Sequence, residues 1–155
     1  MAARTLTYTI NMAGVPKARH SGVNTIAFDF NSGTTKLGTL SDVVLLGKVP
    51  SGALILGKHF NFGAVTSTAG ATWQLQLLAV ESAGTYSVYA TLVPSMTSSA
   101  TAAAFQDWKP YKLSLSDDRA VQYCVLALNA STGATETVSV SFQGFVQYVT
   151  DGSAV

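Results

Sequence analysis

Lys48, Lys58 and His59 are residue types that take part in acid–base chemistry, and they lie close together in the sequence. They fall within residues 42–62, DVVLLGKVPSGALILGKHFNF, where two apolar runs are joined by Pro50-Ser51-Gly52. That tripeptide predicts a turn between two strands, with Pro50 at the first central position of a type I turn. Side chains alternate across a strand, so Lys58 and His59 are expected on opposite faces unless a bulge intervenes. We therefore interpret these groups as parts of two strands rather than as a catalytic cluster.

The two strands predicted over residues 42–62 are largely apolar on both faces. Strands of this kind fit between a core and a neighbouring subunit, which indicates a role in an assembly. In the second strand, one face is predicted to carry Leu54, Leu56, Lys58, Phe60 and Phe62, and the other Ala53, Ile55, Gly57 and His59.

The rest of the sequence offers little for catalysis or metal binding. The two histidines, His20 and His59, are not part of any motif with the ligand spacing of a metal site. Asp117-Asp118 is the only adjacent acidic pair, and SLSDDRAV predicts a solvated turn rather than a glycosidase pair. Cys124 lies in the apolar run AVQYCVLAL, which favours a small buried side chain over a nucleophile. Nucleophile-elbow, phosphate-loop and dinucleotide motifs are absent, so we predict no enzyme activity, no metal and no cofactor.

The composition is poor in charge and rich in hydroxyl groups. Charged residues make up 11% of the 155 residues, and the formal net charge is +1, whereas about 25% is usual in a soluble domain. The 18 Thr and 16 Ser supply much of the polar surface. Such a surface loses few hydrated ions on contact, so it suits packing against other subunits; a soluble β-protein with a neutral surface is the equal alternative. Nucleic acid and membrane partners are not expected, and neither a signal peptide nor a membrane-spanning run is seen.

Alternation with a period of two dominates the chain and predicts strands. VSVSFQGFVQYV, residues 138–149, places apolar side chains on one face and Ser or Gln on the other, with Gly144 predicting a bulge or bend. TWQLQLLAV and TYSVYATLV alternate in the same way. Strand pairs with short links are expected as hairpins or as arches between sheets. These pairs cover 42–62, 72–92 and 120–149, and further strands are expected over 4–10, 23–30 and 111–115.

Residues 94–108, PSMTSSATAAAFQDW, break this alternation. The alanine-rich run predicts one short helix over about 98–106, with a loop as the alternative. We predict an all-β, jelly-roll-like β-sandwich of about eight or nine strands with one short helix; an immunoglobulin-like sandwich is the alternative. The predicted organisation is an N-terminal arm over 1–22, a single β-sandwich domain over 23–150 and a flexible tail over 151–155.

The N-terminal arm is basic. Residues 1–28 contain Arg4, Lys17 and Arg19 but no acidic residue, and His20 lies beside them. The arm also contains apolar residues that a free tail would not need. We predict that these four residues dock on a protein partner; a solvated terminus and contact with DNA are the alternatives.

Two aromatic residues near Pro110 are further candidates for partner binding. Trp108, in FQDWKPY, is predicted to anchor an interface, since Trp is enriched at interaction hot spots, or to cover the open end of the sandwich. If the partner is a glycan, Trp108 and Tyr111 are the residues expected to face it. Trp73 follows the alternation of its strand and is expected in the core.

Three stretches together resemble structural proteins of tailed-bacteriophage virions, of the capsid decoration or cement type. They are DVVLLGKVPSGALIL, with its turn at Lys48, Pro50 and Gly52; TWQLQLLAVESAGTYSVYATLV; and the long segment from YKLSLSDD to GFVQYV. The resemblance covers roughly residues 40–150 and rests on the order of strands and turns. It implies a non-enzymatic β-sandwich without catalytic residues.

The resemblance also implies a function, partners and a location. The expected function is to bind the outer capsid surface and to reinforce the shell by bridging neighbouring major-capsid subunits. The expected partners are the major capsid protein and further copies of the chain, as a trimer or a dimer, in a virion assembled from protein made in the bacterial cytoplasm. The alternative is a tail- or fibre-associated virion protein, or a carbohydrate-binding β-sandwich module.

Overall fold

The computed structural model of the protein describes ten strands and no helix in residues 5–7, 22–35, 37, 40–50, 52–63, 71–80, 85–97, 103–113, 123–132 and 139–150. No described segment forms a helix long and apolar enough to span a membrane. The strands are β1 (Thr5–Thr7), β2 (Asn24–Asn31), β3 (Val43–Pro50), β4 (Leu54–Phe62), β5 (Thr72–Val80), β6 (Tyr86–Thr97), β7 (Ala103–Asp107), β8 (Tyr111–Lys112), β9 (Tyr123–Thr132) and β10 (Ser141–Val149).

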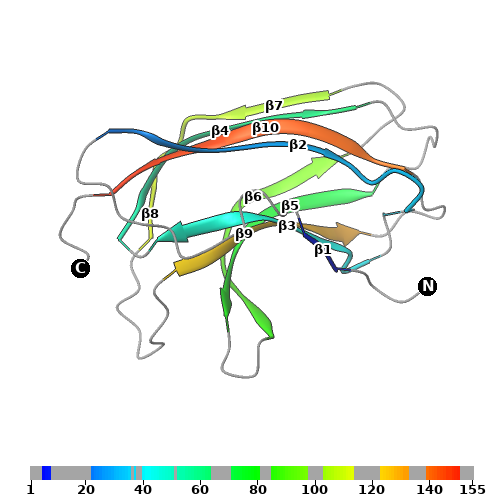
Figure 1. Cartoon of the computed structure of the whole chain (residues 1–155), viewed down its shortest axis with the longest axis horizontal. Coiled ribbons are helices and arrows are strands. Elements are labelled where there is room, and N and C mark those ends of the chain that lie inside the picture. The colour runs from blue at the N-terminus through cyan, green and yellow to red at the C-terminus, as the bar shows by residue number, and fades with distance from the viewer. Residues whose placement is uncertain are drawn as a thin grey trace.

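Eight of these strands form two sheets in jelly-roll order (Figure 1). One sheet has the order β2-β10-β4-β7 and the other the order β3-β9-β5-β6. These eight strands pair in a nested order along the chain: β2 pairs with β10, β3 with β9, β4 with β7 and β5 with β6. This nested antiparallel pairing is that of a double-sheet jelly roll, so the predicted fold class is confirmed over its immunoglobulin-like alternative. β1 adds a parallel strand beside β3, and β8 pairs with β4.

Two of the three short links predicted between strands cross from one sheet to the other. β3 and β4 belong to different sheets, as do β9 and β10, whereas β5 and β6 form a hairpin within one sheet. At the β3–β4 crossing, the Ala53 N–H donates to the Pro50 carbonyl at 3.3 Å, and Gly52 has a φ of 78°. Pro50 therefore starts the turn instead of occupying its first central position. Gly52 supplies the left-handed backbone that the turn needs.

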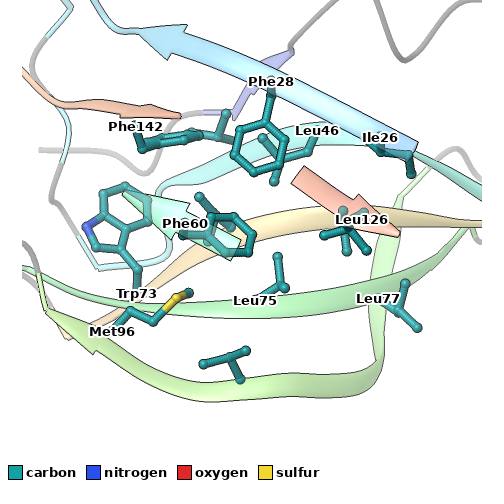
Figure 2. Close-up of a cluster of buried hydrophobic side chains, with 14 of the residues drawn as sticks. Ile26, Phe28, Leu46, Phe60, Trp73, Leu75, Leu77, Met96, Leu126 and Phe142 are labelled. Carbon is teal, nitrogen blue, oxygen red and sulfur yellow. The ribbon is translucent and has the colours of Figure 1, made fainter. Parts of the chain in front are cut away.

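The core fills the space between the sheets (Figure 2). Phe142 of β10 is 1% exposed, and its ring lies among those of Phe30, Phe28 and Phe62, with centroids 4.8, 5.9 and 5.9 Å away. Burying each such ring contributes about 1.5–3 kcal/mol to folding. The facing sheet contributes Leu46, Trp73, Leu75, Leu77, Met96 and Leu126 to the same cluster.

The helix predicted over 98–106 is wrong in its described part. β7 (Ala103–Asp107) is a strand, and its Phe105 pairs with Phe60 of β4. β6 continues as a strand to Thr97, and residues 98–102 lie outside the described residues. Alanine favours a helix by only a fraction of a kcal/mol per residue. The backbone hydrogen bonds that β7 makes to β4 outweigh that preference.

Gly144 was predicted to mark a bulge or bend in β10, and the structure has no bulge at this residue. It pairs in regular register with both β2 and β4. A Cβ at this position would overlap the carbonyl oxygen of His59, so glycine is required by the close approach of the two strands. The shift in register lies further along β10, between Gln147 and Tyr148, opposite residues 55–57 of β4.

Candidate functional site: the two outer faces of the sandwich

Lys48, Lys58 and His59 do not form a cluster. Lys48 lies in β3, in the other sheet from β4, which carries Lys58 and His59. Lys58 is 2% exposed, and its Nζ donates to the carbonyl of Lys109 at 3.1 Å. His59 lies on the outer face, where its ring stacks on that of Phe145 with centroids 5.6 Å apart. The prediction that Lys58 and His59 point to opposite faces is confirmed.

An extra residue in β4 changes the alternation on which the sequence analysis relied. Ile55 pairs with Tyr148 and Gly57 with Gln147, so Leu56 is left over between them. Ile55 and Phe60 are therefore both fully buried, although the sequence placed them on opposite faces. The predicted assignment of side chains to the two faces of β4 is therefore correct only after this bulge, where Lys58, Phe60 and Phe62 are buried.

The described residues contain no metal site and no exposed thiol. No group of three or more His, Cys, Asp or Glu gathers among them. Cys124 is fully buried, as its apolar run predicts. What the described surface does offer is two contrasting outer faces, one on each sheet.

The outer face of β2, β10 and β4, termed the polar face, carries mostly uncharged polar side chains. Its members alternate along each strand with the buried core residues. Asp29 is the only Asp, Glu, Lys or Arg among them. The set is Thr25, Ala27, Asp29, Asn31, Gly57, His59, Asn61, Ser141, Gln143, Phe145 and Gln147.

A depression of about 530 Å³ lies at one end of the polar face. Within it, the Gln143 Nε2 donates to the Asp29 Oδ1 at 3.2 Å. Amide, carboxylate and hydroxyl groups therefore line a single hollow. Its lining residues are Asp29, Asn31, Asn61, Phe62, Gly63, Ser141, Phe142 and Gln143.

Trp108 lies over the polar face beyond His59. A Cβ on Gly57 would overlap Cε3 and Cζ3 of Trp108, so the indole lies against the backbone of that glycine. The side chain is nevertheless 54% exposed. Gly57 and His59 are alternate residues of β4, so the rings of Trp108, His59 and Phe145 follow one another along the same face. The predicted role of Trp108 in partner binding stays a prediction, and its exposure is consistent with it.

Tyr111 lies in different surroundings from Trp108. It pairs with Ile55 of β4, and its ring packs against the main core. Burial raises the pKa of Tyr111 above its ordinary value of 10.0, and Tyr89 and Cys124 act in the same direction. The two aromatic residues proposed for partner binding therefore do not present comparable surfaces, and the role of Tyr111 also stays a prediction.

The four candidate residues of the N-terminal arm, Arg4, Lys17, Arg19 and His20, lie outside the described residues, so their roles stay predictions. Of the predicted arm, the structure describes Thr5–Thr7 and Gly22. Thr5–Thr7 forms β1, which pairs with β3 at one edge of its sheet.

The outer face of β3, β9 and β5, termed the apolar face, carries a second buried cluster. Leu45, Leu78, Val125 and Ala127 are each at most 4% exposed, and Val43 and Val80 pack against them. Cross-strand register joins Leu45 to Ala127 and Leu78 to Val125. The expectation that β3 is apolar on both faces is confirmed, since its core face is also buried.

The β5–β6 hairpin extends the apolar face outward. Figure 1 shows the end of β5 and the start of β6 bending away from the sandwich, and three shifts in register between the two strands accompany the bend. Tyr86 and Val88, opposite Val80 and Leu78, are 41% and 52% exposed. Exposed apolar side chains are therefore continuous with the buried cluster, an arrangement that marks an interaction surface.

The remaining part of this sheet's outer face is polar, but its amides bond to one another. The Gln76 Nε2 donates to the Gln74 Oε1 at 2.8 Å, and the Asn129 Nδ2 donates to the Gln76 Oε1 at 3.2 Å. Gln74 in turn donates to the carbonyl of Pro94 at 3.1 Å. This network ties β5, β6 and β9 together instead of presenting hydrogen-bonding groups to a ligand.

Comparison with known proteins identifies the fold. No family model and no curated protein matches the chain. A chain in the capsid of Ralstonia phage GP4 matches with a TM-score of 0.64 at 15% identity, over 96% of this chain and 99% of that one. A chain in the capsid asymmetric unit of cyanophage Pam1 matches with a TM-score of 0.52 at 17% identity, over 90% and 92% of the two chains.

A chain of the infectious bursal disease virus Gt strain matches with a TM-score of 0.52 at 14% identity, over 85% of this chain but 34% of that one. At these identities, the likeness shows a shared fold. The resemblance to structural proteins of phage virions, stated from the sequence, is therefore confirmed for the fold. The decoration type stays a prediction.

Proposed function

We propose that the chain is a structural protein of a phage virion, which binds the outer surface of the capsid and reinforces it by bridging neighbouring major-capsid subunits. The observation that carries the proposal is the fold likeness to the Ralstonia phage GP4 chain, which spans 96% of this chain and 99% of that one. The match therefore spans nearly the whole of both chains. The role is mechanical, without catalysis, cofactor or nucleic acid.

The partners in this proposal are the major capsid protein and further copies of the chain, as a trimer or a dimer. The charge-poor composition supports it, because few ions lose water when such a surface is covered. Individually weak contacts gain strength when symmetry repeats them around a shell. The location that follows is the outer surface of the virion, after synthesis in the bacterial cytoplasm.

The exposed start of β6, next to the buried cluster of the apolar face, is the part of the described surface that best fits a protein partner. Tyr86 and Val88 present apolar area that becomes buried on contact, at about 25 cal/mol for each Å² removed from water. The cluster beneath them, with Leu78 and Val80, gives the hairpin a fixed base. An apolar projection of this kind suits insertion between subunits.

The test is binding of the purified chain to empty capsids of its phage, measured by co-sedimentation over a range of concentrations. We expect saturation at a fixed ratio of chain to major capsid protein. Val88→Asp is expected to weaken binding at least tenfold, because it puts a charge into the contact. Val23→Asp is the matched control, since Val23 is also exposed, at 55%, and lies away from the hairpin. A wild-type chain that does not bind capsids would refute the proposal, and equal binding by both variants would refute the role of the hairpin.

A further inference from the structure

The polar face combines two kinds of group, aromatic rings and side-chain amides. Trp108, His59 and Phe145 present ring surfaces in succession along β4 and β10. One row further along the sheet, Asn61 and Gln143 stand opposite each other at the edge of the depression. Ring surface beside a hollow lined with amides is the composition of a small-molecule site, in which apolar walls hold the ligand and a few polar groups orient it.

The rings are positioned by the backbone beneath them. Because the indole of Trp108 lies against Gly57, one part of the ring is covered and the exposed 54% of the side chain faces away from the strand. His59 and Phe145 hold each other nearly parallel, with an interplanar angle of 22°. An aromatic surface fixed in this way binds a ligand with little loss of side-chain entropy.

The polar groups match hydroxyls better than they match ions. An amide both donates and accepts, as a hydroxyl does, so Asn61 and Gln143 can each pair with a sugar hydroxyl. The described residues that line the depression include no Lys or Arg, and Asp29 contributes a carboxylate. Phosphate, nucleic acid and acidic sugars are therefore disfavoured, since each would bring negative charge beside that carboxylate.

We infer that the polar face binds a neutral oligosaccharide, with apolar C–H faces of the sugar rings on Trp108 and hydroxyls on Asn61 and Gln143. Gly57 and Asn61 are four residues apart along β4, a span of about 13 Å. A single sugar cannot reach from the indole to the depression, so the ligand contains several linked sugars. This inference goes beyond the proposed capsid role, and the face it uses is separate from the hairpin.

The test uses the full chain and the fluorescence of its two tryptophans. Trp73 is 1% exposed and Trp108 is 54% exposed, so a ligand on the polar face changes the Trp108 emission and leaves that of Trp73 nearly constant. The probes are neutral tetrasaccharides of glucose and of mannose, free glucose, and a sialylated oligosaccharide of similar length. We expect a saturable change with at least one neutral tetrasaccharide, a response at least tenfold weaker with glucose, and none with the sialylated probe.

Two variants and one control locate the site, with calorimetry replacing fluorescence where Trp108 is removed. Trp108→Ala and Gln143→Ala are each expected to weaken binding at least tenfold, while Tyr86→Ala, on the opposite side of the molecule, leaves it unchanged. Circular dichroism before each titration establishes that the variants are folded. The inference is overturned if no neutral tetrasaccharide binds, if the sialylated probe binds as well as the neutral ones, or if both variants bind like the wild type.

Two further experiments separate the sources of the ligand and the roles of the faces. Binding to intact host cells that a soluble tetrasaccharide abolishes would support a polysaccharide of the cell surface as the source. Tetrasaccharide binding without cell binding would support a free polysaccharide. If Trp108→Ala instead abolishes binding to empty capsids, the polar face is a contact with the shell and the saccharide assignment is wrong.

Discussion

The two outer faces of the sandwich use similar side chains in opposite ways. On the polar face, Asn61 and Gln143 line an open depression, and Trp108 keeps half of its surface in water. On the other sheet, Gln74 and Gln76 bond to each other, and the neighbouring cluster of aliphatic residues is buried. Residue type alone therefore does not show whether a polar side chain is available to a ligand. Its availability depends on burial and on how many of its hydrogen bonds are already made. Gln143 donates to Asp29 but is exposed, whereas Gln76 is 4% exposed and bonds to Gln74 and Asn129.

The difference indicates that the two sides of the domain suit different partners. The exposed residues of the projecting hairpin, Tyr86 and Val88, fit a protein surface, whereas the polar face fits a hydroxyl-rich ligand. In the proposed virion, a face that contacts the shell and a face that points away from it would be on opposite sides. The following substitutions test whether the two faces are separable.

The largest effect is expected from Phe142→Ala, which should damage both faces together. Phe142 packs against Phe28, Phe30 and Phe62 between the sheets. Removing the ring leaves a cavity, and we expect a loss of about 3–5 kcal/mol in the free energy of unfolding. Urea denaturation followed by tyrosine and tryptophan fluorescence measures this loss. A loss below about 1 kcal/mol would show that the two sheets do not share one cooperative core.

Two glycine substitutions should differ in the part of the molecule that they affect, because Gly57 lies on the polar face and Gly144 pairs with the buried Phe28 and Phe60. In Gly144→Ala the new methyl group meets the backbone carbonyl of His59, which cannot move without breaking the sheet, so we expect a cost of about 1–3 kcal/mol. In Gly57→Ala the methyl group meets the side chain of Trp108, which can swing away, so the cost should be nearer to about 1 kcal/mol.

The two glycine variants are distinguished by their effects on binding and on fluorescence. Gly57→Ala should alter the Trp108 emission and weaken saccharide binding while leaving capsid binding intact. If Gly57→Ala weakened capsid binding as strongly as saccharide binding, the faces would not be separable.

The smallest effect is expected from Tyr111→Phe and appears only at high pH. Burial raises the pKa of Tyr111, so the folded state favours the neutral phenol. Its contribution to stability is complete below the ordinary pKa of 10.0 and is lost as the pH rises through the raised pKa of the folded state. The wild type should therefore lose stability above pH 10 more steeply than Tyr111→Phe, as measured by thermal melts. Parallel pH profiles of the two proteins would contradict this account.

Much of the fold could be predicted from the sequence because a half-buried strand has a simple period. The alternation in residues 138–149 and in TWQLQLLAV predicted β10 and β5. The turn residues between strands predicted three pairs of strands with short links. The helix expected over 98–106 failed because local alanine content carries no information about pairing with a distant strand. The prediction of the face on which Ile55 lies was wrong because one extra residue in β4 reverses the alternation. Such a bulge is visible only in the pairing with the partner strand.

The candidate site was only partly accessible to sequence reasoning. Trp108 could be singled out as a Trp in a loop, but the other residues of the polar face come from three strands far apart in the chain. Asp29, Asn61 and Gln143 meet only because β10 lies between β2 and β4. No local pattern distinguishes these amides from those of the network around Gln76. The long-range register of the sheet was the missing information.

The nested order of the strand pairs also has a consequence for how the chain folds. The hairpin β5–β6 joins neighbours in sequence, and each pair outside it, up to β2–β10, closes a longer loop. Because closing a loop costs more entropy as it lengthens, each inner pair shortens the effective loop for the next. We expect folding to begin at the hairpin and to proceed outward, on the millisecond-to-second timescale of domains dominated by non-local pairing. The last strands to join would be β2 and β10, which form much of the polar face, so that face would be completed only when the domain as a whole has folded.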